Sequence, residues 1–203
     1  MYLTKLNMDI AHPSARAALI NRQDLHRNLM QAFEKGRQEE SVLYRLVEKK
    51  NGIQVIVLST AEPERTALQN RGMTVEAVTD LSNLPRLYGN GASFHFNLFA
   101  VPSKKISEEG VKNSRRVFLK EPGARMEWLK KQGIKYGFEV LECHEPSAIK
   151  KISVIRKGGA FDFVAVELEG TVRITDGELF WPAWQNGIGP EKAYGTGLML
   201  LSK

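Results

Sequence analysis

Apolar and polar residues alternate along the first half of the chain in a way that predicts strands, interrupted by two stretches with helical spacing. Residues 14–33 carry apolar side chains three or four positions apart, which predicts a helix in one piece or, if Asn21 or Asp24 caps a new start, in two. Asn51-Gly52 between two β-branched runs is typical of a hairpin turn. The resulting order, β-α-β-β-α-β, is that of a ferredoxin-like unit. The expected strands are 2–10, 42–47, 53–58 and 74–78. The expected helices are 14–33 and a short one that starts at Pro63, continues through 66–70 and is ended by Gly72.

The same order of elements is predicted a second time, after a linker at residues 84–91. A basic connection at 104–120 joins the first strand of this half to a helix, and Lys157-Gly158-Gly159 separates two further strands. We therefore predict an α+β protein with two tandem ferredoxin-like, RRM-like domains, at residues 1–86 and 92–203. The expected elements of the second domain are strands 93–101, 152–156, 161–172 and 198–201, and helices 123–136 and 176–184.

The composition adds a basic surface to an otherwise ordinary globular chain. The 203 residues are 42% hydrophobic, which is enough for a core, and the net charge of +6 favours a polyanionic partner. A single cysteine, Cys143, excludes an internal disulfide, and no Cys/His cluster has zinc-ligand spacing, so we expect no metal site. No apolar run approaches the roughly 18 residues of a membrane span. The start of the chain lacks a signal-peptide core, so we expect a cytoplasmic protein without a membrane partner.

A glycine-rich stretch at residues 187–197 precedes the last strand. Four glycines there exclude a helix interior and favour positive φ angles or a close approach of another group. No glycine is followed by Lys-Ser or Lys-Thr, and Lys192 stands where a third glycine of a dinucleotide-binding motif would fall, so we expect no nucleotide cofactor. The stretch is a candidate for RNA binding through its amides and Lys192. Its glycines are Gly187, Gly189, Gly195 and Gly197.

His26 is the histidine whose position favours chemistry. It lies on the first predicted helix, at the margin of the apolar row formed by Leu25 and Leu29. Arg22 precedes it by one turn and Arg27 follows it directly. An imidazole gives or takes a proton near neutral pH, so His26 is a candidate acid or base; a helix histidine without a role is the alternative. Structural roles are expected for the other three histidines, His12, His95 and His144.

Two further basic segments are candidates for contact with nucleic acid. Arg156-Lys157-Gly158-Gly159 would place two cations on a flexible turn, although a plain solvated turn is equally consistent with this stretch. The following residues match the RNA-recognition consensus poorly, so base stacking on that strand is not expected. The basic connection adds Lys112, Arg115, Arg116 and Lys120.

Several segments together resemble the CasE family, the CRISPR repeat-processing endoribonucleases of the Cascade complex. The resemblance runs through nearly the whole chain, and the glycine-rich stretch is its most specific part. It is carried by Leu25-His26, Arg116-Val117-Phe118-Leu119, Glu169-Gly170 and the run from Gly187 to Leu198.

The resemblance implies a metal-independent endoribonuclease that cuts precursor CRISPR RNA at the base of each repeat hairpin and stays bound as a Cascade subunit. RNA supplies the 2′-hydroxyl nucleophile, so such an enzyme needs alignment, a proton carrier and cations. The catalytic histidine of the family matches His26. An assisting family tyrosine falls on Gln23, which cannot act as a phenolic proton carrier but can hydrogen-bond the phosphate or the 2′-hydroxyl. Candidate phosphate clamps are Arg27, Lys157 and Lys192, and the candidate RNA-binding residues are Arg22, Lys112, Arg115, Arg116, Lys120, Arg156, Gly187, Gly189, Lys192, Gly195 and Gly197.

Two other functions remain compatible with the sequence. Gln23 is compatible with a catalytically silent subunit that binds hairpin RNA without cutting it. A ferredoxin-like regulator of a small ligand is the second alternative, because this fold carries many unrelated functions. Such a regulator would show no salt-sensitive affinity for RNA.

Overall fold

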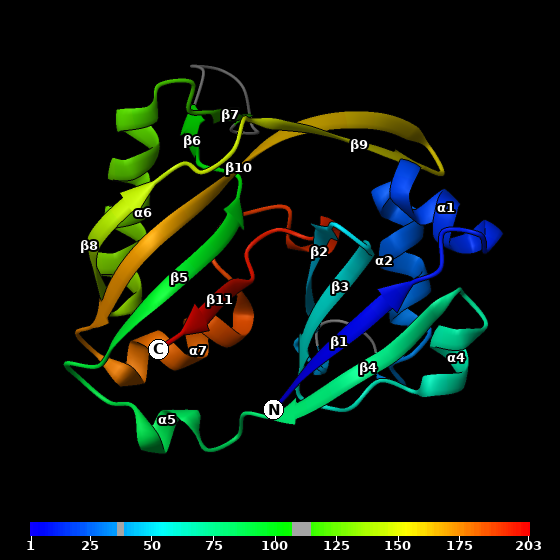
Figure 1. The fold of residues 1–203 in the computed structure, drawn as a ribbon. Coiled ribbons are helices and arrows are strands. Elements are labelled where there is room, and N and C mark those ends of the chain that lie inside the picture. Colours follow the sequence, from blue (N-terminus) through cyan, green and yellow to red (C-terminus); the bar gives the residue numbers. More distant parts are fainter. Residues whose placement is uncertain (36–38, 107–114) are drawn as a thin grey trace.

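Two antiparallel sheets lie side by side, and helices pack against one face of each sheet (Figure 1). The computed structural model describes residues 1–35, 39–106 and 115–203. The predicted α+β fold with two ferredoxin-like domains is confirmed. The short helix α5 (Leu84–Leu87) lies in the connection between the sheets, where a linker was expected. We propose domain boundaries at residues 86 and 92 on that basis.

The first sheet has the strand order β2-β3-β1-β4, with all neighbours antiparallel. This is the order of a ferredoxin-like unit, and each predicted strand is present. The Asn51-Gly52 turn joins β2 to β3 as expected, with Lys49 opposite Gly52. The strands are β1 (Tyr2–Met8), β2 (Leu43–Lys49), β3 (Gly52–Ser59) and β4 (Met73–Asp80).

Among the described residues, three helices cover one face of this sheet, and the first helical region forms two helices, one of the two forms that the sequence left open. The first helix, α1 (Pro13–Ile20), starts with a proline at its first turn, where a missing N–H costs nothing. Asn21 has an extended backbone, so it ends α1 and caps α2 (Arg22–Met30). Leu25 and Leu29 of α2 are fully buried, together with residues of α1 and of α4 (Arg65–Gln69).

The second sheet has the order β11-β5-β10-β8 and is covered by α6 (Pro122–Tyr136) and α7 (Gly177–Asn186). The predicted cap of α7 is present: Asp176 Oδ1 accepts hydrogen bonds from the amides of Glu178 and Leu179, at 2.9 and 3.1 Å. The strands are β5 (Ser93–Ala100), β8 (Phe138–His144), β10 (Gly159–Ile174) and β11 (Met199–Ser202).

The prediction was wrong about which strand completes this sheet. Residues 152–156 form a strand as expected, β9 (Lys150–Arg156), but it pairs with the first part of β10, residues 159–165, off the main path of the sheet. The β9–β10 ribbon extends away from the sheet towards α1 and α2 (Figure 1). The fourth strand is β8, paired with residues 169–174. It was missed because this edge strand is only shallowly buried and lacks clean alternation.

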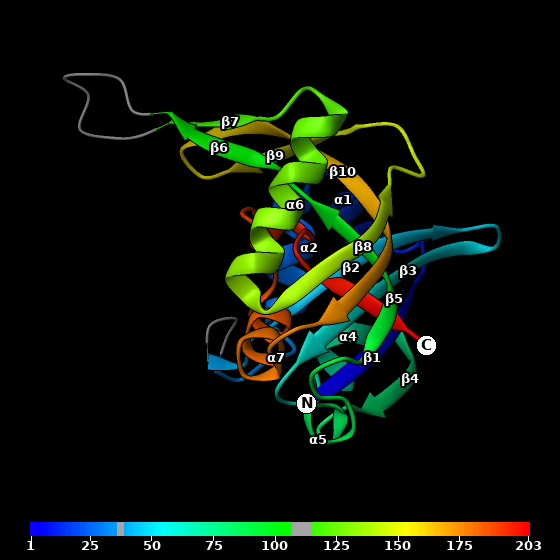
Figure 2. The same cartoon turned by 90° about the vertical axis from the view of Figure 1, so that its left-hand side faces the viewer.

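A second hairpin was also missed. The expected basic connection contains β6 (Ser103–Ile106) and β7 (Arg115–Phe118), which pair antiparallel and project beside the top of α6 (Figure 2). Both strands have only four residues, too few for a period-2 pattern to stand out. The hairpin therefore carries part of the basic segment away from the main sheet.

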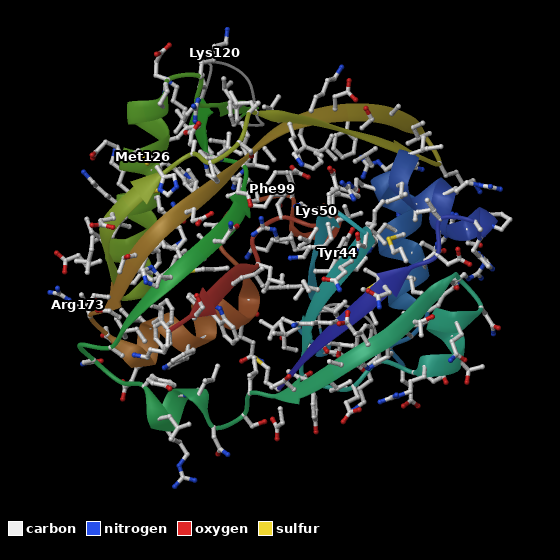
Figure 3. All side chains as sticks on the ribbon, in the orientation of Figure 1. Tyr44, Lys50, Phe99, Lys120, Met126 and Arg173 are labelled. Atoms are coloured by element: carbon white, nitrogen blue, oxygen red, sulfur yellow. The ribbon has the colours of Figure 1, made fainter. Side chains whose placement is uncertain are left out.

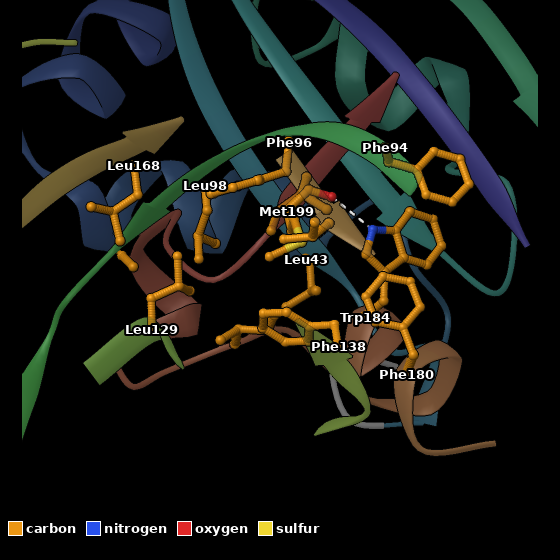
Figure 4. Packing of buried hydrophobic residues seen from close by; sticks show 14 of the residues in the cluster. Leu43, Phe94, Phe96, Leu98, Leu129, Phe138, Leu168, Phe180, Trp184 and Met199 are labelled. Atoms are coloured by element: carbon orange, nitrogen blue, oxygen red, sulfur yellow. Dashed lines mark hydrogen bonds between the residues drawn. The ribbon is translucent and has the colours of Figure 1, made fainter. Parts of the chain in front are cut away.

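The core of the second domain continues into the first. Leu43 of β2 packs among Phe96, Leu98 and Met199 (Figure 4), and Ile56 and Leu58 belong to the same cluster. Apolar area shared in this way resists rotation of one sheet against the other. The domains are therefore held in one arrangement by a common core.

A polar network crosses the same junction. Arg45 of β2, 6% exposed, forms an ion pair with Glu167 at 2.5 Å and also donates to Asn97 of β5. Asn97 donates in turn to Glu167 at 2.9 Å and to Glu169 at 3.0 Å. Burial raises the pKa of Glu167, but the hydrogen bond from Asn97 and the charge of Arg45 outweigh burial and leave that pKa lowered. The network therefore favours an ionised Glu167 and a fixed register between the sheets.

Candidate active site

His26 lies half-buried on α2, next to the junction of the two domains. Asn21 sets the start of this helix, since its Oδ1 accepts the amide hydrogen of Gln23 at 3.1 Å. Because α2 buries Leu25 and Leu29, Gln23 and His26, three residues apart, fall on a shared face away from the core. The local sequence thus places an imidazole and an amide side by side.

The β9–β10 ribbon is fastened to the N-terminus of α2. Asn21 Nδ2 donates to the carbonyl of Ile155 at 2.9 Å, and the amide of Ile155 donates to Asn21 Oδ1 at 3.0 Å. These two bonds join residues 134 positions apart. They bring the exposed cations Arg156 and Lys157, at the tip of the ribbon, to the end of the helix that carries His26.

The glycine-rich stretch reaches the same place from the second domain. It contains a short 3₁₀ turn, η1 (Lys192–Tyr194), which packs against α2 and β2. Tyr44 of β2 lies at the junction (Figure 3), and its hydroxyl donates to the carbonyl of Ala193 at 2.7 Å. Gly195 follows with φ +87°, and a Cβ there would stand 3.0 Å from Tyr44 Cε2. Gly195 is therefore required for close packing as well as for its backbone angle.

The other glycines of this stretch also pack against protein. A Cβ at Gly187 would stand 2.9 Å from Leu43, and one at Gly189 would stand 3.2 Å from Trp128. Gly187, Gly195 and Gly197 are buried. The structure thus gives these positions a packing role, and their contact with RNA stays a prediction.

Tyr194 joins the site, and the sequence reasoning did not single it out. Its hydroxyl donates to Gln23 Oε1 at 3.3 Å, and its ring meets the His26 ring edge-on, with centroids 6.4 Å apart. Phe161 and Phe163 of β10 flank the same ring at 5.7 and 6.0 Å. The sequence held one indication of a role for Tyr194, because this tyrosine lies inside the stretch that was predicted to bind RNA.

Three predicted cations lie on or near α2, in different surroundings. Arg22 is largely buried: burial lowers the pKa of its guanidinium, while Tyr44 and Glu48 raise it in part. Its Nη1 is buried and makes no hydrogen bond within the described part of the chain. Arg27 is exposed and forms an ion pair with Asp24 at 2.5 Å. Lys192 lies on η1. Arg22 is thus the cation least screened by water, where attraction for an anion is strongest.

A second group of cations lines two adjoining hollows near the β6–β7 hairpin. Both hollows contain Arg116, Ser103 and Pro190. One, of about 290 Å³, is walled by Phe118, Phe161 and Phe163; the other, of about 360 Å³, adds three lysines that were not predicted, Lys105, Lys131 and Lys135. The structure therefore extends the basic surface beyond the residues chosen from sequence.

The remaining predicted residues of the basic connection are placed as follows. Lys112 lies outside the described residues, and Arg115 is the first residue of β7. Lys120 is exposed, and its carbonyl accepts a hydrogen bond from buried Arg125. The β6–β7 hairpin that carries Arg115 lies beside α6 (Figure 2).

No group of three or more His, Cys, Asp or Glu side chains is placed to hold a metal ion among the residues described. Within the same part of the chain, no helix has both the length and the apolar character needed to cross a membrane.

Comparison with known proteins links this arrangement to one family. The model of a family described as CRISPR associated protein matches residues 1–203. The CRISPR-associated endoribonuclease Cse3 of Thermus thermophilus is 30% identical over 215 residues, which cover 98% of each chain.

Solved structures agree with the sequence match. A structure of CRISPR endoribonuclease Cse3 bound to 19 nt RNA superposes with a TM-score of 0.88 at 28% identity, covering 100% of both chains. Thermus thermophilus Cse3 bound to an RNA representing a pre-cleavage complex gives a TM-score of 0.86 at 27% identity, covering 100% of this chain and 98% of the other.

Proposed function

The chain belongs to the CRISPR-associated CasE family, and from that premise we propose that it is an endoribonuclease that cleaves precursor CRISPR RNA within each repeat. Two findings support the proposal: the relatives of similar length are named endoribonucleases, and two of the similar structures contain RNA. The observation that carries it is the position of His26. It stands at the domain junction with Arg22 on its own helix and the exposed cations Arg156 and Lys157 at the helix start.

We propose a reaction that needs no metal. The 2′-hydroxyl of the RNA loses its proton to water and attacks the adjacent phosphorus in line, the bond to the 5′-oxygen breaks, and protonated His26 gives that oxygen a proton. The products are a 2′,3′-cyclic phosphate and a 5′-hydroxyl end. Negative charge develops on the non-bridging oxygens, so cations held close to them stabilise the transition state. Arg22 is well suited to this because it is largely buried, while Arg27, Lys157 and Lys192 are further candidates.

We propose that the RNA hairpin is held by its phosphates and its shape. Bases of an A-form stem are hidden in a deep, narrow groove, so side chains reach the backbone more readily. The β9–β10 ribbon tip and the hollows around Arg116 offer cations for such contacts. Cleavage at the base of the hairpin and retention of the product as a Cascade subunit are parts of the same proposal.

One cleavage experiment tests this function. Repeat RNA is incubated with the protein in excess chelator, with and without a 2′-deoxy substitution at the scissile nucleotide. Wild type is compared with His26→Ala and with a matched control, His144→Ala, which removes an exposed histidine from β8 in the other domain. We expect cleavage in chelator by wild type and by His144→Ala. We expect none with the deoxy RNA or with His26→Ala.

Each rival function gives a different result. A silent RNA-binding subunit would bind the repeat tightly without cutting it. A small-ligand regulator would show no salt-sensitive affinity for the RNA. Persistent cleavage by His26→Ala would refute the assignment of the proton carrier, and a magnesium requirement would refute the mechanism.

A further inference from the structure

Tyr194 is the residue that the second domain adds to the surroundings of His26. Its η1 turn is bracketed by two left-handed residues, Glu191 with φ +60° and Gly195 with φ +87°. The hydroxyl of Tyr44, a residue that is 1% exposed, holds the carbonyl of Ala193 at 2.7 Å. The backbone that carries Tyr194 is therefore fixed to the first domain on both sides of the ring.

The ring of Tyr194 is also held from the side of β10. Phe161 meets it edge-on, with an interplanar angle of 70°, and Phe163 lies at a tilt of 37°. Arg156 in turn lies over Phe161, with its guanidinium carbon 5.2 Å from the ring centroid. Packing on several sides leaves the ring little rotational freedom, so the direction of its hydroxyl is set before any ligand binds.

That hydroxyl is directed at Gln23. The hydroxyl donates to Gln23 Oε1 at 3.3 Å. The Gln23 amide is therefore oriented with its Nε2 group, which carries two N–H donors, pointing away from Tyr194. Nε2 makes no hydrogen bond within the described part of the chain. Gln23 and His26 are three residues apart on α2, so the two side chains project from the same face of the helix.

We propose that Tyr194 is a positioning residue of the cleavage reaction, which acts through Gln23 to hold the Gln23 Nε2 donors beside His26 for a non-bridging oxygen of the scissile phosphate. The inference rests on the proposed ribonuclease function and deepens it. If the Gln23 amide could flip freely, its oxygen would face the scissile phosphate half of the time. The negative phosphate would repel that oxygen. The bond from Tyr194 removes that orientation, because an oxygen that accepts from the phenol cannot also face the phosphate. The catalytic centre is then assembled from both domains.

The test is Tyr194→Phe, which removes the hydroxyl and keeps the packed ring. Single-turnover cleavage of repeat RNA in chelator is measured beside RNA affinity and the thermal midpoint. We expect the cleavage rate to fall about tenfold, which corresponds to about 1.4 kcal/mol of lost transition-state stabilisation, with affinity and midpoint unchanged. The matched control is Tyr88→Phe, another half-buried tyrosine packed edge-on against a phenylalanine, Phe94, at 5.1 Å. It should cleave like wild type.

A double-mutant cycle separates positioning from a structural effect. Gln23→Ala should lower the rate by a similar factor, and Gln23→Ala with Tyr194→Phe should lower it no further, because the two side chains act as one unit. An RNA whose leaving 5′-oxygen is replaced by sulfur needs no proton donor at that atom. With this RNA, His26→Ala should recover cleavage, while Tyr194→Phe should keep its defect.

The outcomes distinguish this inference from the function on which it rests. A wild-type rate for Tyr194→Phe overturns the inference, and so does a loss confined to RNA affinity. Additive effects of the two substitutions also overturn it. Absence of cleavage by the wild-type protein would instead defeat the proposed function.

Discussion

Replacing Gly195 by alanine is expected to cost more stability than the same change at Gly91, although both glycines have the same backbone angle. Their φ values are +87° and +86°. An L-residue in this region costs about 1–2 kcal/mol, partly offset by the smaller unfolded-state entropy of alanine, about 0.4–1 kcal/mol. This contribution is common to both positions, so it cancels in the comparison.

The difference comes from what the new Cβ meets. At Gly91 nothing lies within 4 Å, whereas at Gly195 the Cβ would stand 3.0 Å from Tyr44 Cε2. Tyr44 is 1% exposed and holds Ala193 through its hydroxyl, so it cannot move aside. Overpacking of this kind typically costs about 1–3 kcal/mol. We therefore expect Gly195→Ala to be less stable than Gly91→Ala by about that amount.

Urea unfolding of both variants and of wild type, with the slopes compared, measures this difference. A Tyr44→Leu background removes the atom that the Cβ would meet, so Gly195→Ala should cost no more there than Gly91→Ala. Because η1 carries Tyr194, Gly195→Ala should also slow cleavage at temperatures where the protein is folded. Equal costs within about 0.5 kcal/mol in the wild-type background, the usual tolerance of additivity, would refute the packing argument.

Two further predictions concern ion pairs. The fold lowers the pKa of Glu167, so the ionised side chain stabilises the protein above its ordinary pKa of 4.5. This stabilisation is lost as the pH falls through the lower folded value. Acid unfolding should therefore be less steep in Glu167→Gln. Arg125, 2% exposed, binds both oxygens of Glu145 at 2.6 and 2.7 Å, so Arg125→Ala should cost about 3–5 kcal/mol in urea unfolding. Lys130→Ala breaks an exposed ion pair on the same helix and should change the free energy of unfolding little. Similar losses of stability in Arg125→Ala and Lys130→Ala would contradict the role of burial.

Local rules were sufficient for most elements of the first domain. Alternation, the Asn51-Gly52 turn and the cap at Asn21 each depend on neighbours in the chain, and each is present in the fold. The same rules failed at β8 and at the β6–β7 hairpin. An edge strand and two four-residue strands bury too little for a hydrophobic period to be visible.

The fold class, the family resemblance and the choice of His26 follow from residue types and their spacing along the chain. The contacts of the glycine-rich stretch depend instead on how the two domains pack together. Gly187 and Gly195 pack on β2, and Tyr194 comes to Gln23, 171 residues away in the chain. Contacts between positions so far apart are fixed by the shared core and by the bonds of Asn21 and Tyr44, and no local pattern encodes them.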